Sequence, residues 1–378
     1  MTGRMAILLK LRWLPLFMLL LACVDRVEFS TPPAGEQLVV EGVISDEPGP
    51  YTVLLSIASS NNAPVSDPIP VTGAGIELYE DGVKIDSYVE EDAGIYRTAS
   101  TTRGVAGRTY HIVITTVDGS TYSSEPEEMI ASGTIDDLTY EFESFDVVQH
   151  VPGSDGDTLR FVDRFNIFID ATTANGDGFL RWRTTGTYHV KTYPELAFEQ
   201  QIDGTIVPTP WRCSGVIWDG FNLVRVGPCE CCDCWVIAKE KSPLVSDQSF
   251  LIGDDYTHIK VSEVVVTPRT FFDKYRVEVE QMSMSKKAHE FFRLIKAQSD
   301  GIGSLFQPPF GTIRGNIIAQ DPNQKVLGLF WTTSVYRKYI YLNKDNVPKK
   351  VLPIDTVKDR CLYIGAPNSS TLKPSFWQ

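Results

Sequence analysis

Six cysteines in the second half of the chain carry the clearest potential for chemistry: Cys213, Cys229, Cys231, Cys232, Cys234 and Cys361. Two pairs within the run from Cys229 to Cys234 have the Cys-x2-Cys spacing typical of zinc ligands. These pairs interleave, so two separate zinc knuckles cannot form in so short a run. An even number of cysteines in an oxidising compartment indicates disulfides instead. We expect disulfides and no metal site, and metal–thiolate or reactive-thiol chemistry are the alternatives.

The pairing of these cysteines is only partly constrained by the sequence. Cys213 and Cys361 have no cysteine nearby in the chain. We therefore expect each of them to bridge to the cluster at 229–234. Six cysteines allow many connectivities, so the complete pairing stays open.

A seventh cysteine, Cys23, ends the run Leu20-Leu21-Ala22-Cys23. Basic residues and an apolar run over residues 13–22 precede it, as in a signal peptide. That run is too short to span a bilayer, which needs roughly 20 residues. The four-residue run resembles a bacterial lipobox, in which the cysteine thiol is lipidated and its amine becomes the new N-terminus. We expect residues 1–22 to be removed and Cys23 to carry a covalent lipid as the only cofactor; the alternative is an ordinary secretory signal.

Residues 23–36 are predicted to form a lipidated tether, because they are polar, contain prolines and glycine, and lack periodicity. Asp25 and Glu28 lie just after the lipidated cysteine. Acidic residues at this place resemble the surface-export signals of Bacteroidota lipoproteins. We expect a protein anchored by lipid in the outer membrane and exposed at the cell surface.

Motifs for catalysis are missing from the sequence. It contains no Gly-x-Ser-x-Gly elbow, His-Glu-x-x-His helix, phosphate loop or dinucleotide fingerprint. The five histidines are scattered, and the paired carboxylates Asp136-Asp137 and Asp254-Asp255 are expected in solvated turns. The net charge of −13 argues against nucleic acid as a partner. We expect a protein that is not an enzyme.

The first part of the mature chain, residues 37–126, reads as short strands with alternating apolar residues. Asp81-Gly82 and Asp118-Gly119 each stand between two such runs, which is a hairpin signal. About seven strands without a helical period predict an immunoglobulin-like or transthyretin-like β-sandwich. Residues 126–138 are predicted to be a hinge.

A larger β-rich domain is predicted over residues 135–345, with one amphipathic helix and an irregular cysteine-rich insertion at 192–235. The helix covers residues 286–297, where Ser285 is the expected N-cap and Ala288, Phe291, Phe292 and Ile295 form an apolar stripe. Residues 346–378 look like an irregular tail, held in place if Cys361 is bridged. The predicted fold class is therefore mainly β.

Aromatic residues gather around the cysteine-rich insertion: Trp211, Trp218, Phe221 and Trp235. A loop held by disulfides can present aromatic side chains rigidly, and such side chains anchor many interfaces. We expect these four residues to form a contact surface. The alternative is that they cover the local core.

The sequence resembles the family of Bacteroidota outer-membrane lipoproteins called domain of unknown function 4249. The matching pieces are Leu38-Val39-Val40-Glu41-Gly42, Gly94-Ile95-Tyr96, Gly107-Arg108-Thr109-Tyr110, Asp118-Gly119-Ser120-Thr121-Tyr122-Ser123-Ser124, Ile135-Asp136, Gly303-Ser304-Leu305-Phe306, Gly315-Asn316-Ile317 and Gly328-Leu329-Phe330. They occur in the expected order over nearly all of the mature chain. The resemblance implies an envelope lipoprotein, often encoded beside TonB-dependent transporters, with no established catalytic residues.

Three functions follow as expectations. The first is a non-enzymatic binding partner of a TonB-dependent transporter that helps to capture an unknown nutrient ligand. The second is a structural or adhesive envelope lipoprotein without a role in transport. The third is a hydrolase, which would require a cleft with convergent carboxylates or a Ser–His pair.

Substitution of Cys23 by Ser removes the thiol that would be acylated. We expect the Cys23→Ser protein to leave the membrane fraction, because the acyl chains supply the membrane affinity. Fractionation of cells followed by immunoblotting measures the distribution. Retention of the variant in membranes would contradict the lipid anchor.

Overall fold

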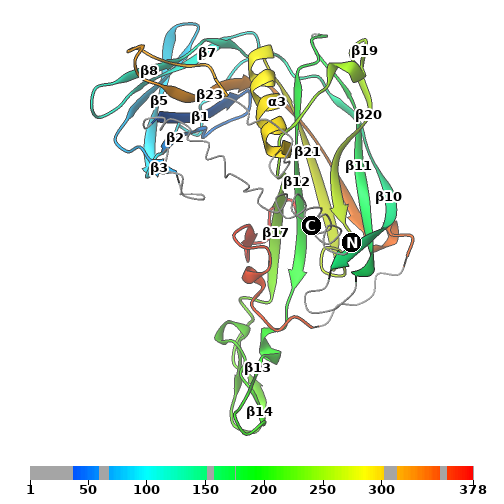
Figure 1. The fold of residues 1–378 in the computed structure, drawn as a ribbon. Helices are drawn as coiled ribbons and strands as arrows, with labels where there is room; N and C mark the ends of the chain where they lie inside the picture. The colour runs from blue at the N-terminus through cyan, green and yellow to red at the C-terminus, as the bar shows by residue number, and fades with distance from the viewer. Residues whose placement is uncertain are drawn as a thin grey trace, which may run out of the picture. The chain divides into compact units, whose positions relative to one another are not determined.

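The computed structural model describes residues 37–58, 68–150, 157–174, 176–301, 313–349 and 356–377. The predicted signal peptide, Cys23 and the tether up to residue 36 lie outside these ranges. The described residues belong to one compact unit. They form many strands and one α-helix (Figure 1), which confirms the predicted mainly β fold class. No helix within these ranges has the length and apolar character needed to cross a membrane.

Eleven strands make the first sheet, in the order β22-β8-β7-β4-β5-β6-β2-β1-β23, with β3 paired to β2 and β9 paired to β7. Their bounds are β1 (Gln37–Ser45), β2 (Thr52–Ala58), β3 (Ile69–Pro70), β4 (Gly75–Glu80), β5 (Val83–Asp92), β6 (Ile95–Arg97), β7 (Thr109–Thr115), β8 (Thr121–Ser124), β9 (Glu127–Glu128), β22 (Ile317–Ala319) and β23 (Val326–Thr333). Strand β5 pairs with β4 along its first half and with β6 along its second half. It therefore links the two halves of the sheet.

The two halves of this sheet enclose a single core. Alternate residues of each strand point inward, since side chains on a strand alternate between faces. Ile76 and Leu78 of β4 are buried together with Val40 of β1 and with Val53 and Leu55 of β2. This arrangement agrees with the sandwich predicted from the alternating pattern.

The boundaries predicted for the two domains differ from those in the structure. Residues 317–333 were assigned to the C-terminal domain, but β22 pairs with β8 and β23 pairs in parallel with β1 over its whole length. Strand β23 is a nearly continuous apolar run, and such a run does not reveal the sheet to which it belongs. The predicted hinge at 126–138 also contains a strand, β9, which pairs with β7.

Close backbone contacts hold β23 in place beside β1. Gly328 has a positive φ of 107°, and a Cβ atom there would lie 1.8 Å from the carbonyl oxygen of Val40. On the other side of β23, the Asn316 amide donates to the carbonyl of Phe330 (2.6 Å) and accepts from its N–H (3.0 Å). The side chain of Asn316 thus acts as a short piece of neighbouring strand.

The second part of the chain forms two further sheets, in the orders β10-β11-β20-β19 and β24-β21-β12-β17-β25, with β18 paired to β12. Their bounds are β10 (Ile135–His150), β11 (Asp157–Thr172), β12 (Leu180–Lys191), β17 (Asp233–Lys239), β18 (Leu244–Val245), β19 (Leu251–Ile252), β20 (Asp255–Val265), β21 (Lys274–Ser283), β24 (Val335–Asn343) and β25 (Ser369–Ser370). Strand β25 comes from the predicted irregular tail and pairs with β17.

A second core fills the space between these two sheets. Phe165 and Ile167 of β11 share it with Trp182 of β12 and Val279 of β21. Strands β11 and β12 are consecutive in the sequence, yet they lie in different sheets. The indole N–H of Trp182 is satisfied by Gln281, which it contacts at 2.9 Å. Trp182 can therefore be buried without leaving its N–H group unpaired.

The predicted amphipathic helix is confirmed as α3 (Lys286–Gly301). The hydroxyl of Ser285 accepts the N–H of Ala288 at 3.1 Å, which is the expected N-cap interaction. Ala288 is fully buried, and Phe291 and Phe292 pack against Leu329 and other residues of the same small core. The helix therefore covers strand β23 with its apolar face.

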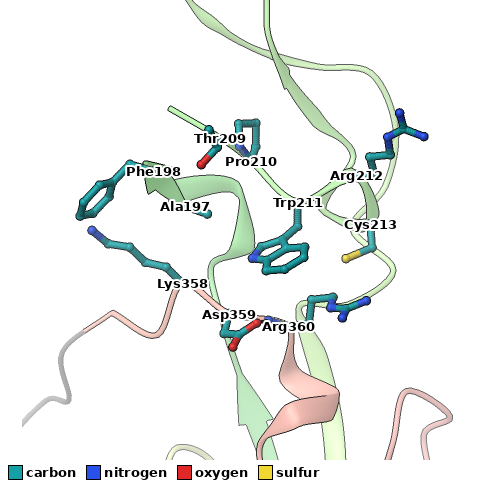
Figure 2. A pocket seen from close by; sticks show the side chains of 10 residues that line it. All are labelled: Ala197, Phe198, Thr209, Pro210, Trp211, Arg212, Cys213, Lys358, Asp359 and Arg360. Carbon is teal, nitrogen blue, oxygen red and sulfur yellow. Dashed lines mark hydrogen bonds between the residues drawn. The ribbon is translucent and has the colours of Figure 1, made fainter. Parts of the chain in front are cut away.

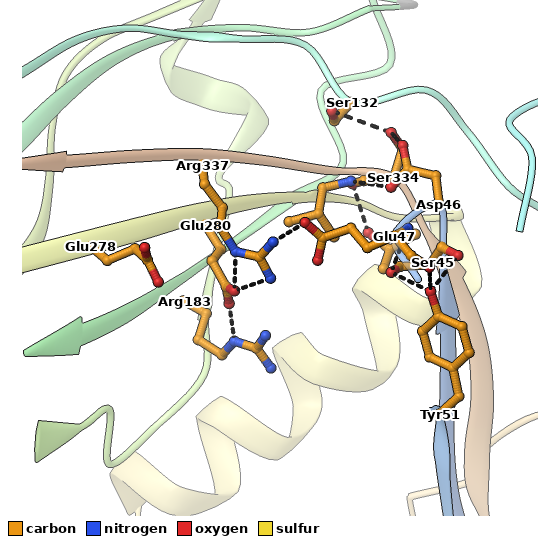
Figure 3. Close-up of polar contacts among 12 residues, drawn as sticks. Ser45, Asp46, Glu47, Tyr51, Ser132, Arg183, Glu278, Glu280, Ser334 and Arg337 are labelled. Atoms are coloured by element: carbon orange, nitrogen blue, oxygen red, sulfur yellow. Dashed lines mark hydrogen bonds and ion pairs between the residues drawn. The ribbon is translucent and has the colours of Figure 1, made fainter. Parts of the chain in front are cut away.

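Only Ser334 separates β23 of the first sheet from β24 of the other sheet. Figure 3 shows the polar contacts around this point: the Ser334 hydroxyl donates to Asp46 at 2.5 Å, and the N–H of Val335 donates to the same carboxylate at 3.0 Å. Nearby, Arg337 forms ion pairs with Glu280 and Glu47. Residues from β24, β21 and the end of β1 thereby hold the two parts together.

Glu127 lies close to the start of α3 and is almost fully buried. The Ser285 hydroxyl donates to one of its carboxylate oxygens at 2.9 Å, while the other oxygen has no partner among the described residues. Burial raises the pKa of Glu127 to about 7, against the opposing effects of Ser285 and Lys287. Below about pH 7 this side chain is therefore mostly protonated in the folded protein.

We expect the free energy of unfolding to fall as the pH rises from about 5 to 8. The stabilisation from a raised carboxyl pKa is complete below the unfolded-state value and is lost as the pH passes the folded-state value. The Glu127→Gln variant should lose roughly 2 kcal/mol of this pH dependence. Urea unfolding at both pH values measures it, and an unchanged difference in the variant would contradict the assignment.

Candidate contact surface on the cysteine-rich arm

The segment between β12 and β17, residues 192–232, is named the arm here. It was predicted to be irregular, but it contains two short hairpins, β13 (Phe198–Gln200) with β14 (Ile206–Pro208) and β15 (Val216–Trp218) with β16 (Leu223–Arg225). The hairpin of β13 and β14 extends past the ends of β12 and β17 (Figure 1). Its strands are three residues long, which is why the sequence pattern did not reveal them.

All six cysteines outside the N-terminal region form disulfides: Cys213–Cys231, Cys229–Cys232 and Cys234–Cys361. Cys213 and Cys361 each bond to a cysteine of the cluster, as expected. The Cys361 N–H also donates to the carbonyl of Cys231 at 3.1 Å. The Cys234–Cys361 bond and this hydrogen bond hold the tail against the start of β17 and the end of the arm. Across the ranges that the structure describes, no group of three or more His, Cys, Asp or Glu side chains is arranged to hold a metal ion.

The four aromatic residues predicted to form a contact surface have different surroundings. Trp211 is 37% exposed and Phe221 is 86% exposed, so both present apolar surface to solvent. Trp218 is half-buried. Trp235 is also half-buried, and it stacks on His189 with ring centroids 5.1 Å apart. Trp211 and Phe221 are therefore exposed, as residues of a contact surface must be, whereas Trp235 packs on His189; that these residues form a contact surface stays a prediction.

Besides Trp211 and Phe221, the arm carries eight further exposed apolar side chains that the sequence analysis did not single out. Ten of the 31 large hydrophobic side chains that are exposed among the described residues lie in the arm. They are Leu196, Phe198, Ile202, Ile206, Trp211, Ile217, Phe221, Leu223, Val224 and Val226. Apolar runs of this kind predict buried strands. Here the hairpins lack a second layer to cover them, so the side chains face solvent.

A hollow of 920 Å³ lies between the arm and the tail (Figure 2). The arm contributes Phe198 and Trp211, and the tail contributes Lys358 and Arg360. The ammonium group of Lys358 lies 4.0 Å from the centroid of the Phe198 ring, and the Arg360 guanidinium lies 4.7 Å from the Trp211 ring. Sequence reasoning missed Lys358 and Arg360. The available signal was the position of Arg360 directly before Cys361.

A Ser–His pair exists where α3 packs beside β18, as a hydrolase would require, but it lacks catalytic geometry. Ser246 and His289 are buried, and the Ser246 hydroxyl donates to the carbonyl of Gly178 at 2.6 Å. His289 Nε2 lies 2.8 Å from the carbonyl of Ser246, a contact in which the nitrogen must donate. Burial lowers the pKa of His289. The imidazole nitrogen nearest the hydroxyl thus carries a proton and cannot act as its base.

Comparison with known protein families gives a match over most of the chain. The model of a family described as "Domain of unknown function (DUF4249)" matches residues 24–339, a range that contains the whole arm and ends before Lys358 and Arg360. No curated protein matches the chain.

Removal of the Cys234–Cys361 disulfide is expected to cost much more stability than removal of Cys229–Cys232. The first bond joins cysteines 127 positions apart, and the second joins cysteines three positions apart. A longer loop constrains the unfolded chain more strongly, so the losses should be roughly 5 and 2 kcal/mol. Urea unfolding of the two double Cys→Ala variants measures both values. Equal losses would show that loop closure does not govern the effect.

Proposed function

Since the chain belongs to the DUF4249 family, a domain of unknown function, we propose that it is a lipid-anchored accessory protein of the outer membrane. Acyl chains on Cys23 hold it at the cell surface, where it partners a TonB-dependent transporter and helps to capture a nutrient. It binds and performs no catalysis. The covalent lipid is the only cofactor that this function requires.

The exposed apolar surface of the arm is the observation that carries the proposal. Burial of apolar surface is favourable by roughly 25 cal/mol per Å², so a partner that covers these side chains gains affinity. Ile202 and Phe221, on different hairpins, are among the most exposed of them. Concentrated exposed apolar side chains are typical of protein interaction sites.

The disulfides support the same role by limiting the motion of the arm. Cys213–Cys231 and Cys229–Cys232 both lie at its base. A surface that is ordered before binding loses less conformational entropy on association. A lipid tether adds to this effect, since confinement to the same membrane raises the effective concentration of the partner.

The test is recovery of an outer-membrane barrel with the tagged protein from native membranes, quantified by mass spectrometry. We expect the variant with Ile202→Ser and Phe221→Ser to recover about tenfold less barrel, because apolar anchors dominate interface energies. The matched control is Val83→Ser with Val117→Ser, which removes two exposed apolar side chains from β5 and from the turn after β7, outside the arm.

Two results would contradict the proposal. One is the absence of any barrel in the wild-type sample, and the other is an equal loss in the arm variant and the control. Normal growth of a deletion strain on limiting nutrients, together with a weakened envelope, would favour the structural or adhesive function instead. Only an accessory role in transport leads to an uptake defect.

A further inference from the structure

We propose that the hollow between the arm and the tail binds a small anionic ligand with a planar apolar body, as in an aromatic carboxylate. This inference deepens the proposed function, on which its biological role rests, because it names the class of ligand that is captured. Its test uses purified protein without a transporter. Failure of the ligand site and failure of the transporter partnership are therefore distinguishable.

The charge of the hollow favours an anion. Lys358, Arg360 and Arg212 line it, and in the described part of the chain none of these three forms an ion pair with a carboxylate. Asp359 is the only acidic residue of the lining, and its carboxylate accepts a hydrogen bond from the backbone N–H of Arg360 at 2.7 Å. The Arg212 guanidinium points away from Phe198 and Lys358 (Figure 2), so Lys358 and Arg360 supply the positive charge, two cations against one carboxylate on a chain whose net charge is −13.

Arg360 has an unused donor at this site. Its Nε–H is buried and has no hydrogen-bond partner among the residues that the structure describes. A carboxylate is the group that an arginine side chain binds best, because two parallel N–H donors match its two oxygens. The Arg360 guanidinium lies against the Trp211 and Tyr363 rings, with 4.7 Å and 4.2 Å to their centroids, and a carboxylate would bind at the outer, Nη edge of the guanidinium.

The aromatic walls favour a planar body on the ligand. Figure 2 shows the indole ring of Trp211 and the phenyl ring of Phe198 on the arm side of the hollow, with Lys358 and Arg360 on the tail side. A flat apolar group that stacks on either ring would place an attached carboxylate near a cation. The volume of 920 Å³ lies within the range of sites for small molecules.

Two disulfides build this site from distant parts of the sequence. Arg360 directly precedes Cys361, which is bonded to Cys234, and Trp211 lies two residues before Cys213, which is bonded to Cys231. Both walls are therefore fixed to the same short cysteine run. A ligand meets a site that is already ordered, so less binding energy is lost in ordering it.

The experiment titrates the detergent-solubilised mature protein with benzoate, benzamide and inorganic phosphate in a calorimeter. Benzoate combines the planar body with the charge, benzamide keeps the shape without the charge, and phosphate keeps the charge without the ring. We expect benzoate to bind with a Kd below about 1 mM and each of the other two to bind at least about tenfold more weakly.

Variants of the hollow distinguish binding of benzoate in the hollow from general electrostatic attraction of the anion to the arm. Arg360→Gln and Lys358→Gln should each weaken benzoate binding by about tenfold, since each removes a charge-assisted contact. Arg225→Gln removes a charge from the same arm at a residue outside the lining and should leave the affinity unchanged. Lys358 is exposed, so its substitution tests the site even if Arg360→Gln disturbs folding.

Three outcomes would overturn the proposal. They are the absence of benzoate binding at about 10 mM, equal binding of benzoate and either comparison compound, and an equal loss of affinity in Arg225→Gln and the hollow variants. Loss of binding in the Cys234→Ala, Cys361→Ala double variant, with the rest of the protein folded by circular dichroism, would support the role of the disulfide in forming the site.

Discussion

Asp46 accepts hydrogen bonds from Ser334 and Val335 at the point where the chain leaves the first sheet and enters another. The chain crosses between two cores here within one residue, so the orientation of each sheet depends on the contacts at this place. The backbone N–H of Ser334 is held by the Ser283 hydroxyl at 3.0 Å. Charged groups around it are paired, with Glu280 accepting from both Arg183 and Arg337. Glu280 itself is buried, whereas both arginines are partly exposed, so loss of the two arginines would leave the Glu280 carboxylate as a buried charge without a partner, which is unfavourable.

The arm is stabilised by disulfides more than by a hydrophobic core. It has little core of its own, since its hairpins have strands of three residues and many of its apolar side chains face solvent. Short hairpins of this kind are marginally stable alone. Disulfides replace the missing core, and the bond between Cys234 and Cys361 extends this effect to the tail. The exposed apolar surface and the cation-lined hollow both depend on this covalent support.

Several features of the fold were predictable because they arise from local patterns. Alternating apolar residues marked the strands, and Ser285 with the stripe of Ala288 and Phe291 marked the helix. The bonding of Cys213 and Cys361 to the cysteine cluster followed from their isolation in the chain. The placement of β23 was not predictable in this way. Its parallel pairing with β1 joins residues almost 290 positions apart. The apolar residues of a strand do not indicate which other strand it pairs with.

The amino-acid sequence alone determined the mainly β class, the helix, the position of the disulfide cluster and the lipobox resemblance at Cys23. Each of these features depends on residue types and their spacing over a short stretch of the chain, so it can be predicted from the local sequence. Tertiary structure decided which sheet β23 completes, that Trp235 packs while Trp211 and Phe221 are exposed, and that Lys358 and Arg360 meet the arm. The physical reason is that burial and charge pairing depend on neighbours in space, and long-range strand pairing and disulfides bring those neighbours from distant parts of the chain.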